Sequence, residues 1–170
     1  MLVRNEVLFK WSLYGAAAAL CIAVQMALLQ RFSIWGVIPF IYPLIAVIPA
    51  TYEGPKAGTV FALAMGVVSD LLLPAPLPCL YTLLFPAAGL FAALMAQSVL
   101  HSGYLCSLAG GFLAFLLTGT FSCLLLWLKS APAWAAGSFV LLRETCISLP
   151  LAFPVTALFA AVHRRVHRYD

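Results

Sequence analysis

Long apolar stretches alternate with short polar ones along the whole chain, and this pattern predicts about six membrane-spanning helices. The apolar stretches cover residues 11–29, 34–50, 57–73, 79–100, 104–128 and 146–162. A helix is expected for each, because lipid offers no partner to a free backbone N–H or C=O group. With so little chain between the stretches, residues 1–170 form a single integral membrane domain. The predicted fold class is all-α, a polytopic membrane helix bundle.

The second predicted span, residues 34–50, is irregular. It carries Pro39, Pro43 and Pro49, and each proline removes a backbone donor and crowds the preceding turn. At about 1.5 Å per residue the span barely crosses roughly 30 Å of hydrocarbon. The sequence leaves two alternatives, a kinked spanning helix or a re-entrant element shielded by its neighbours.

The sixth predicted span contains Pro150 and Pro154 and is expected to bend there. The preceding residues 131–142 are apolar, and Arg143 and Glu144 follow them. This stretch is interpreted as an interfacial segment lying on the membrane surface.

Composition agrees with the membrane assignment. Hydrophobic residues make up 65% of the chain and charged residues only 8%, and the mean hydropathy is +1.08. Soluble domains average about 25% charged residues, so the lipid bilayer must cover the apolar surface that such a chain cannot bury. The net charge of +4 indicates membrane orientation rather than nucleic-acid binding.

The distribution of lysine and arginine predicts the orientation. With six spans both termini lie on one side, which collects Arg4, Lys10, Lys56, Arg164, Arg165 and Arg168. The other side collects only Arg31, Lys129 and Arg143. Basic residues are enriched in cytoplasmic loops, so both termini are predicted to be cytoplasmic.

Small residues recur at four-residue spacing in two spans, which places them on one helix face. One row consists of Gly54, Gly58, Ala62 and Gly66 and leads to Asp70; the other consists of Gly15, Ala19, Ala23 and Ala27. Lipid gives helices no hydrophobic reason to associate, so small residues that allow close approach supply packing instead. Both rows are candidate helix-packing or partner interfaces, either within this bundle or with another membrane protein.

Asp70 is a carboxylate well inside an apolar span. It is interpreted either as a helix-end carboxylate bonded to a neighbouring loop, or as a proton, cation or partner site. Glu53 is expected to complement the dipole of the helix that follows it. No residue pattern indicates catalysis, a metal site or a cofactor, so the chain is not predicted to be an enzyme.

The stretch from Glu53 to Leu94 resembles the MreD family of rod shape-determining membrane proteins. The resemblance rests on Glu53-Gly54-Pro55-Lys56-Ala57-Gly58 and on the following helix that ends Val67-Val68-Ser69-Asp70, together with the total length and the number of spans. The chain departs from the family pattern after Asp70, where a proline-rich turn at residues 74–78 replaces a turn containing glycine.

The resemblance implies a non-catalytic scaffold of the cell-shape and peptidoglycan-synthesis machinery, the elongasome, in a bacterial inner membrane. Its implied partners are an MreC-like protein and, through it, the RodA glycosyltransferase, its partner transpeptidase and the MreB filament.

MreD is also similar to the substrate-binding subunits of energy-coupling-factor vitamin transporters, whose six-helix architecture is the second possibility. Those subunits dock through small residues on the first helix. They also need an outward-facing pocket with several polar groups, for which Asp70, Tyr81, Thr82 and Gln97 are the few candidates.

Overall fold

The computed structural model of the chain describes residues 2–33, 35–73, 77, 79–98, 103–128 and 134–166. In this part of the chain the regular structure is helical, with no strand, so the predicted all-α class is confirmed. The α-helices are α1 (Leu2–Ala27), α2 (Tyr42–Leu72), α3 (Leu80–Ser98), α4 (Tyr104–Leu128), α5 (Trp134–Ser148) and α6 (Ala152–Val166). Two short 3₁₀ turns, η1 (Leu29–Arg31) and η2 (Leu149–Leu151), follow α1 and join α5 to α6.

The helices are long and apolar enough for a multi-pass membrane protein. Five candidate spans occur among the described residues, at Val7–Arg31, Tyr42–Leu72, Leu80–Ser98, Tyr104–Leu125 and Gly137–Val166. Six separate spans are therefore not confirmed. The predicted spans 34–50 and 57–73 are the ones that differ, because their helical parts belong to the single element α2.

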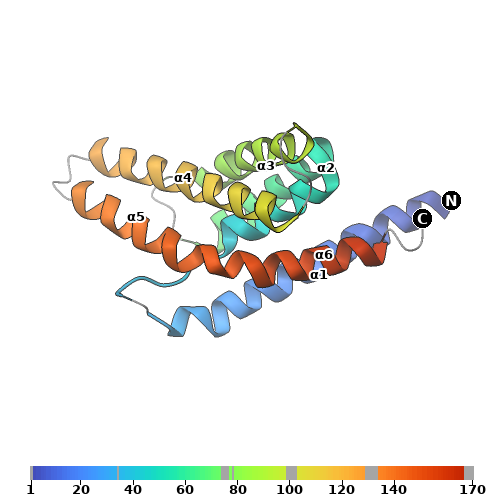
Figure 1. Ribbon diagram of the computed structural model, residues 1–170, viewed down its shortest axis with the longest axis horizontal. Coiled ribbons are helices and arrows are strands. Elements are labelled where there is room, and N and C mark those ends of the chain that lie inside the picture. The colour runs from blue at the N-terminus through green and yellow to red at the C-terminus, as the bar shows by residue number, and fades with distance from the viewer. Residues whose placement is uncertain are drawn as a thin grey trace.

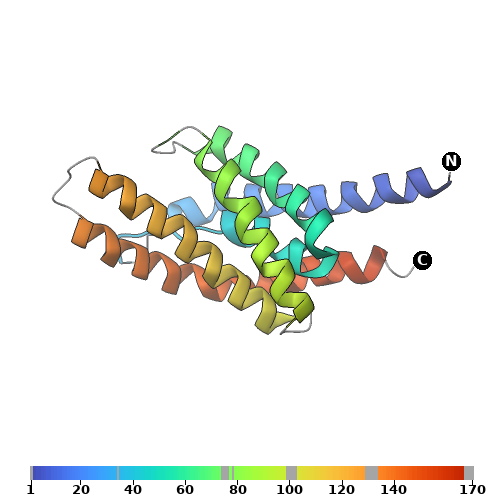
Figure 2. The same cartoon turned by 90° about the horizontal axis from the view of Figure 1, so that it is seen from above.

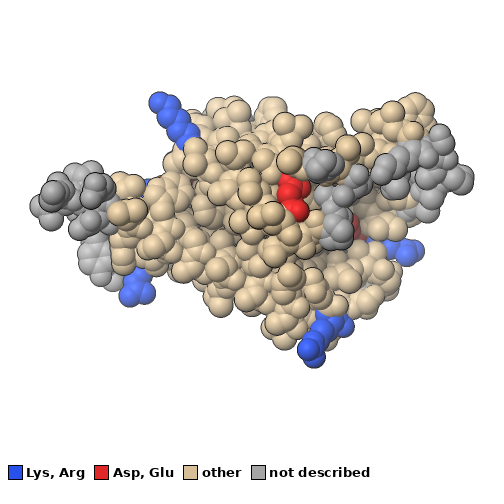
Figure 3. All heavy atoms as spheres, turned by 180° about the vertical axis from the view of Figure 1, so that it is seen from behind, with Lys and Arg blue, Asp and Glu red and all other residues tan. Residues whose placement is uncertain are grey.

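The long helices lie beside one another along the longest axis of the molecule (Figure 1). Helix α1 contacts α6, and α4 runs antiparallel to α5, while α2 and α3 pack together on one side (Figure 2). Both views place the beginning of α1 and the end of α6 at the same end of the bundle. Uncharged residues cover almost all of the face drawn in Figure 3, as expected for a surface in contact with lipid.

Helix α2 is sharply kinked at Gly54, which has φ 82° and ψ 176°. This conformation is essentially restricted to glycine, and Pro55 can follow because the first position of a helix needs no N–H partner. The two halves fold back on each other: a Cβ on Gly58 would lie 2.4 Å from Cα of Ala50. Residues eight apart in a straight helix are separated by about 12 Å.

The first half of α2 is the centre of the core. Residues 42–51 are all buried, and the half extends only about 18 Å, too short to cross the hydrocarbon alone. An irregular segment, described at residues 32–33 and 35–41, leads into it and includes Trp35 and Gly36 at positive φ of 54° and 78°. The predicted helix over 34–50 is therefore wrong for residues 35–41, while residues 42–50 are helical and buried.

Side chains of other helices satisfy the backbone of the irregular segment. The Gln25 side chain of α1 donates to the Pro39 carbonyl at 2.8 Å and accepts from the Ile41 N–H at 3.1 Å. The Phe40 N–H donates to Ser148 Oγ at 2.9 Å. Non-helical backbone at membrane depth is tolerated only where protein buries and satisfies it, and both Gln25 and Ser148 are buried.

The last span is longer than predicted. Helices α5 and α6 join through the 3₁₀ turn that contains Pro150, so the α-helical hydrogen bonding changes at this proline, while the expected bend stays a prediction. Residues 137–142 belong to the candidate span Gly137–Val166. These residues are thus part of a helix long and apolar enough to span, and the interpretation of residues 131–142 as a surface segment stays a prediction. Residues 74–76, 129–133 and 167–170, with Lys129 and Arg168, lie outside the described residues.

Candidate functional site

The small-residue row of α2 packs inside the bundle. Gly58, Ala62 and Gly66 are buried, and a Cβ on Gly66 would lie 2.6 Å from the Tyr81 carbonyl oxygen and 2.7 Å from Cα of Thr82. The approach is reciprocal, since a Cβ on Gly89 of α3 would lie 2.8 Å from the Ala62 Cβ. Gly54 is the kink of α2 rather than a packing position. This row is thus occupied by the protein's own helices.

Asp70 caps the beginning of α3. Its carboxylate accepts from the Tyr81 N–H at 3.1 Å, the Thr82 N–H at 2.8 Å and the Thr82 hydroxyl at 2.6 Å. The first N–H groups of a helix have no intrahelical partner, and a negative charge there is stabilised by the helix dipole. Of the two interpretations of Asp70, the structure therefore supports the helix-end carboxylate.

The small-residue row of α1 points out of the bundle. Gly15, Ala19, Ala23 and Ala27 are all exposed, and no atom lies within 4 Å of the place where a Gly15 Cβ would be. The opposite side of α1 carries the buried residues, among them Tyr14 and Gln25. Packing within the bundle therefore does not explain this row, which lipid or a second protein must cover.

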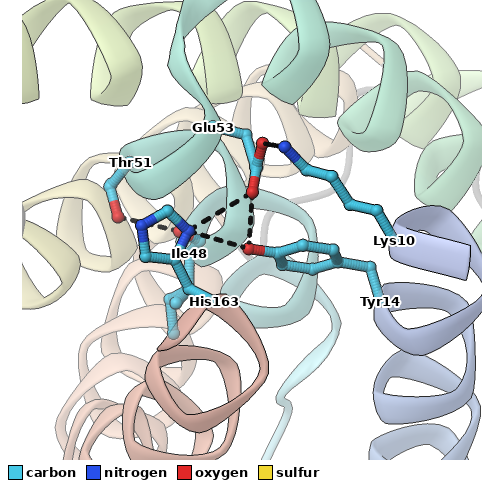
Figure 4. A network of polar contacts seen from close by, with 6 residues as sticks. All are labelled: Lys10, Tyr14, Ile48, Thr51, Glu53 and His163. Atoms are coloured by element: carbon cyan, nitrogen blue, oxygen red, sulfur yellow. Dashed lines mark hydrogen bonds and ion pairs between the residues drawn. The ribbon is translucent and has the colours of Figure 1, made fainter. Parts of the chain in front are cut away.

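A polar network at Glu53 joins three segments that lie far apart in the sequence (Figure 4). Glu53 is the last residue before the kink of α2, and its side chain is only 4% exposed. The Tyr14 hydroxyl of α1 donates to Glu53 Oε1 at 2.8 Å, and Nδ1 of His163 in α6 lies 3.3 Å from the same oxygen. Lys10 of α1 forms an ion pair with Glu53 Oε2.

The network ties α1, the kink of α2 and α6 together at the end where the termini lie. Rings reinforce it, because Tyr14 stacks on Phe159 with centroids 6.1 Å apart and Tyr52 lies 5.3 Å from the His163 ring. The prediction that Glu53 serves the dipole of the following helix missed this role. No local pattern could reveal it, because Tyr14 and His163 are 39 and 110 positions from Glu53.

A cavity of about 380 Å³ lies on the other side of the kinked helix, between the start of α3, α4 and α5. Its lining includes Phe40, Tyr81, Thr118, Ser122, Cys123 and Glu144. Of the pocket residues suggested by the sequence, Tyr81 alone lies there. Asp70 and Thr82 are bonded to each other, and Gln97 is exposed on α3. Glu144 was missed because the sequence analysis interpreted its neighbourhood as a segment on the membrane surface, and no local pattern links it to Phe40 or Tyr81.

The fold and these sites define a multi-pass membrane helix bundle with an outward small-residue face on α1, a buried polar network at Glu53 and a cavity at Glu144. No known family model, characterised protein or solved structure matches the chain.

Proposed function

We propose that this protein is a non-catalytic scaffold subunit that binds another membrane protein through the outer face of α1. The observation that carries the proposal is the exposure of Gly15, Ala19, Ala23 and Ala27. A row of small residues lets a second helix approach closely, which is how helices associate in lipid. The equivalent row of α2 packs against Ala50 and α3, whereas the described part of the chain leaves the row of α1 exposed.

The cell-wall elongation machinery is the assembly that the resemblance to MreD suggests. The stretch that carries the resemblance, Glu53 to Leu94, comprises the kink, the second half of α2 and most of α3. The second half of α2 and α3 pack closely there, through Gly66 against the backbone of Tyr81 and Thr82 and through Gly89 against the Ala62 side chain. We propose an MreC-like protein as the direct partner, with RodA and its transpeptidase as further members of the complex in a bacterial inner membrane.

We further propose six crossings, the second made by the irregular residues 32–41 and the short first half of α2. The folding back at Gly54 supports this topology, because the two halves of α2 then run in opposite directions. Lys10 and His163 both contact Glu53, next to the kink, and Lys56, Arg164 and Arg165 follow closely in sequence. This concentration of basic residues favours a cytoplasmic location for that end.

Capture of the partner from native membranes tests the scaffold role. The variant Gly15→Leu/Ala19→Leu fills the outer face of α1 and is expected to reduce recovery of an MreC-like protein at least tenfold. Ala64→Leu is the matched control, since Ala64 is exposed on α2. Both variants are expected to keep the thermal stability of the parent. Undiminished recovery with the α1 variant would contradict the proposal.

A substrate-binding subunit of an energy-coupling-factor transporter is the second candidate, and the cavity lined by Tyr81 and Glu144 favours it. Such a subunit would also use the α1 face for docking, but onto a transporter subunit. Mass spectrometry of the purified protein separates the two functions. A retained vitamin together with a transporter subunit would support this candidate, and an MreC-like protein would support the scaffold.

A further inference from the structure

Glu144 is an acidic side chain inside the last candidate span, Gly137–Val166. It is partly buried and lines the cavity between α3, α4 and α5. The ion pairs found among the described residues all involve Glu53, and no described cation or hydrogen-bond donor contacts Glu144. An ionised carboxylate within the hydrocarbon costs about 2.5–3.5 kcal/mol on insertion scales unless a partner compensates it. A positive group that entered the cavity would supply such a partner.

The cavity around Glu144 has the size and walls of a small-molecule site. Its volume of about 380 Å³ falls within the roughly 300–1,000 Å³ of ligand pockets. Phe40 and Tyr81 present aromatic rings whose centroids are 6.2 Å apart. Aromatic faces attract cations by about 0.5–2 kcal/mol, so these walls suit both a positive head group and an apolar body.

Polar side chains on α4 add acceptors rather than competing charges. The hydroxyls of Thr118 and Ser122 donate to helix carbonyls at 2.9 and 2.8 Å, so their oxygens can still accept a hydrogen bond. The neighbouring Arg143 lines a separate hollow with Trp35 and Leu142. Among the described lining residues the cavity thus offers one carboxylate, several acceptors and no cation.

We propose that this cavity binds a primary ammonium group carried on an apolar body, with Glu144 as the residue that holds the ammonium. The ammonium would donate to the carboxylate, and the apolar part would lie against Phe40, Tyr81 and Phe115. A soluble aromatic amine and the ethanolamine head group of a lipid both present this chemistry. The inference does not depend on the scaffold role, and under the transporter alternative it gives the class of ligand.

Titration of the full-length protein in phosphatidylcholine nanodiscs with 2-phenylethylamine tests the proposal. Saturable binding at one site is expected, with at least tenfold weaker binding of the neutral 2-phenylethanol and none of phenylacetate. Nanodiscs that contain phosphatidylethanolamine identify the source. Competition by this lipid assigns the site to its head group, and unchanged binding assigns it to soluble amines. Absence of saturable amine binding in phosphatidylcholine, or equal binding of amine and alcohol, would overturn the proposal.

Two variants locate the binding site. Glu144→Gln keeps the shape of the side chain and is expected to weaken amine binding at least tenfold, whereas Thr145→Val, on the same helix but lining another hollow, is expected to stay within twofold. Ser122→Phe retains the carboxylate and fills the cavity, so it is also expected to abolish binding. Monodisperse elution in size-exclusion chromatography shows which variants have folded. Parental affinity in both Glu144→Gln and Ser122→Phe would refute the assignment.

Discussion

The contact between Gly66 and the beginning of α3 leaves no room for a side chain, and replacement of Gly66 by alanine tests this directly. The new Cβ would lie 2.6 Å from the Tyr81 carbonyl oxygen and 2.7 Å from Cα of Thr82. Both neighbours are backbone atoms, which cannot move aside by changing rotamer. The separation must grow to about the 3.4 Å at which ordinary contact begins, so α2 and α3 must move apart.

The expected loss follows from the overpacking and from the cap that the movement disturbs. Overpacking costs about 1–3 kcal/mol, and the hydrogen bonds from Tyr81 and Thr82 to Asp70 sit at the displaced turn. With about 1 kcal/mol for a weakened cap, the total is roughly 2–4 kcal/mol. The gain in helix propensity from glycine to alanine offsets at most about 1 kcal/mol of this loss of stability.

Unfolding in mixed micelles, with increasing sodium dodecyl sulfate and followed by circular dichroism, measures this loss. Gly15→Ala is the matched control, because no atom lies within 4 Å of its Cβ position, and its stability is expected to be equal to or slightly above that of the parent. If Gly66→Ala were as stable as Gly15→Ala, the backbone contact between α2 and α3 would not exist as described.

Three further changes test the polar contacts by the same unfolding assay. Asp70→Asn keeps one acceptor for the first turn of α3 and is expected to be less destabilising than Asp70→Leu; equal losses would point to a required charge instead. Glu53→Ala removes the common partner of Lys10 and Tyr14 and is expected to cost about 1–3 kcal/mol, more than Glu53→Gln, which retains an acceptor. Parental stability of Glu53→Ala would show that the network contributes nothing. Gln25→Leu leaves the Pro39 carbonyl and the Ile41 N–H unpaired, for an expected loss of about 2–4 kcal/mol; parental stability would mean that water satisfies these groups.

The outward face of α1 and the inward row of α2 look alike in sequence, and only the fold distinguishes them. Both are rows of small residues at four-residue spacing, which specify a flat helix face but not its neighbour. The α2 row is buried inside the bundle. The α1 row is exposed, because the opposite face of α1, which carries the larger side chains Tyr14 and Gln25, is the one that packs against the bundle.

The sequence by itself determined the membrane class, the all-helical structure and the positions of α3 and α4 nearly to the residue. These features depend on composition and on the local requirement that the backbone satisfy itself in lipid, so they can be predicted without knowing the neighbours. The irregular chain near Pro39 and the interruption of the α-helix near Pro150 were also predictable, because proline acts on its own turn.

Only the tertiary structure decided which polar groups meet. The positive φ of Gly54 turns α2 back on itself and places Glu53 beside Lys10, Tyr14 and His163. The path of α5 places Glu144 in the lining of a cavity together with Phe40 and Tyr81. Such contacts join residues tens to more than a hundred positions apart. Which residues meet depends on how the helices pack in three dimensions, and local sequence patterns do not encode that packing.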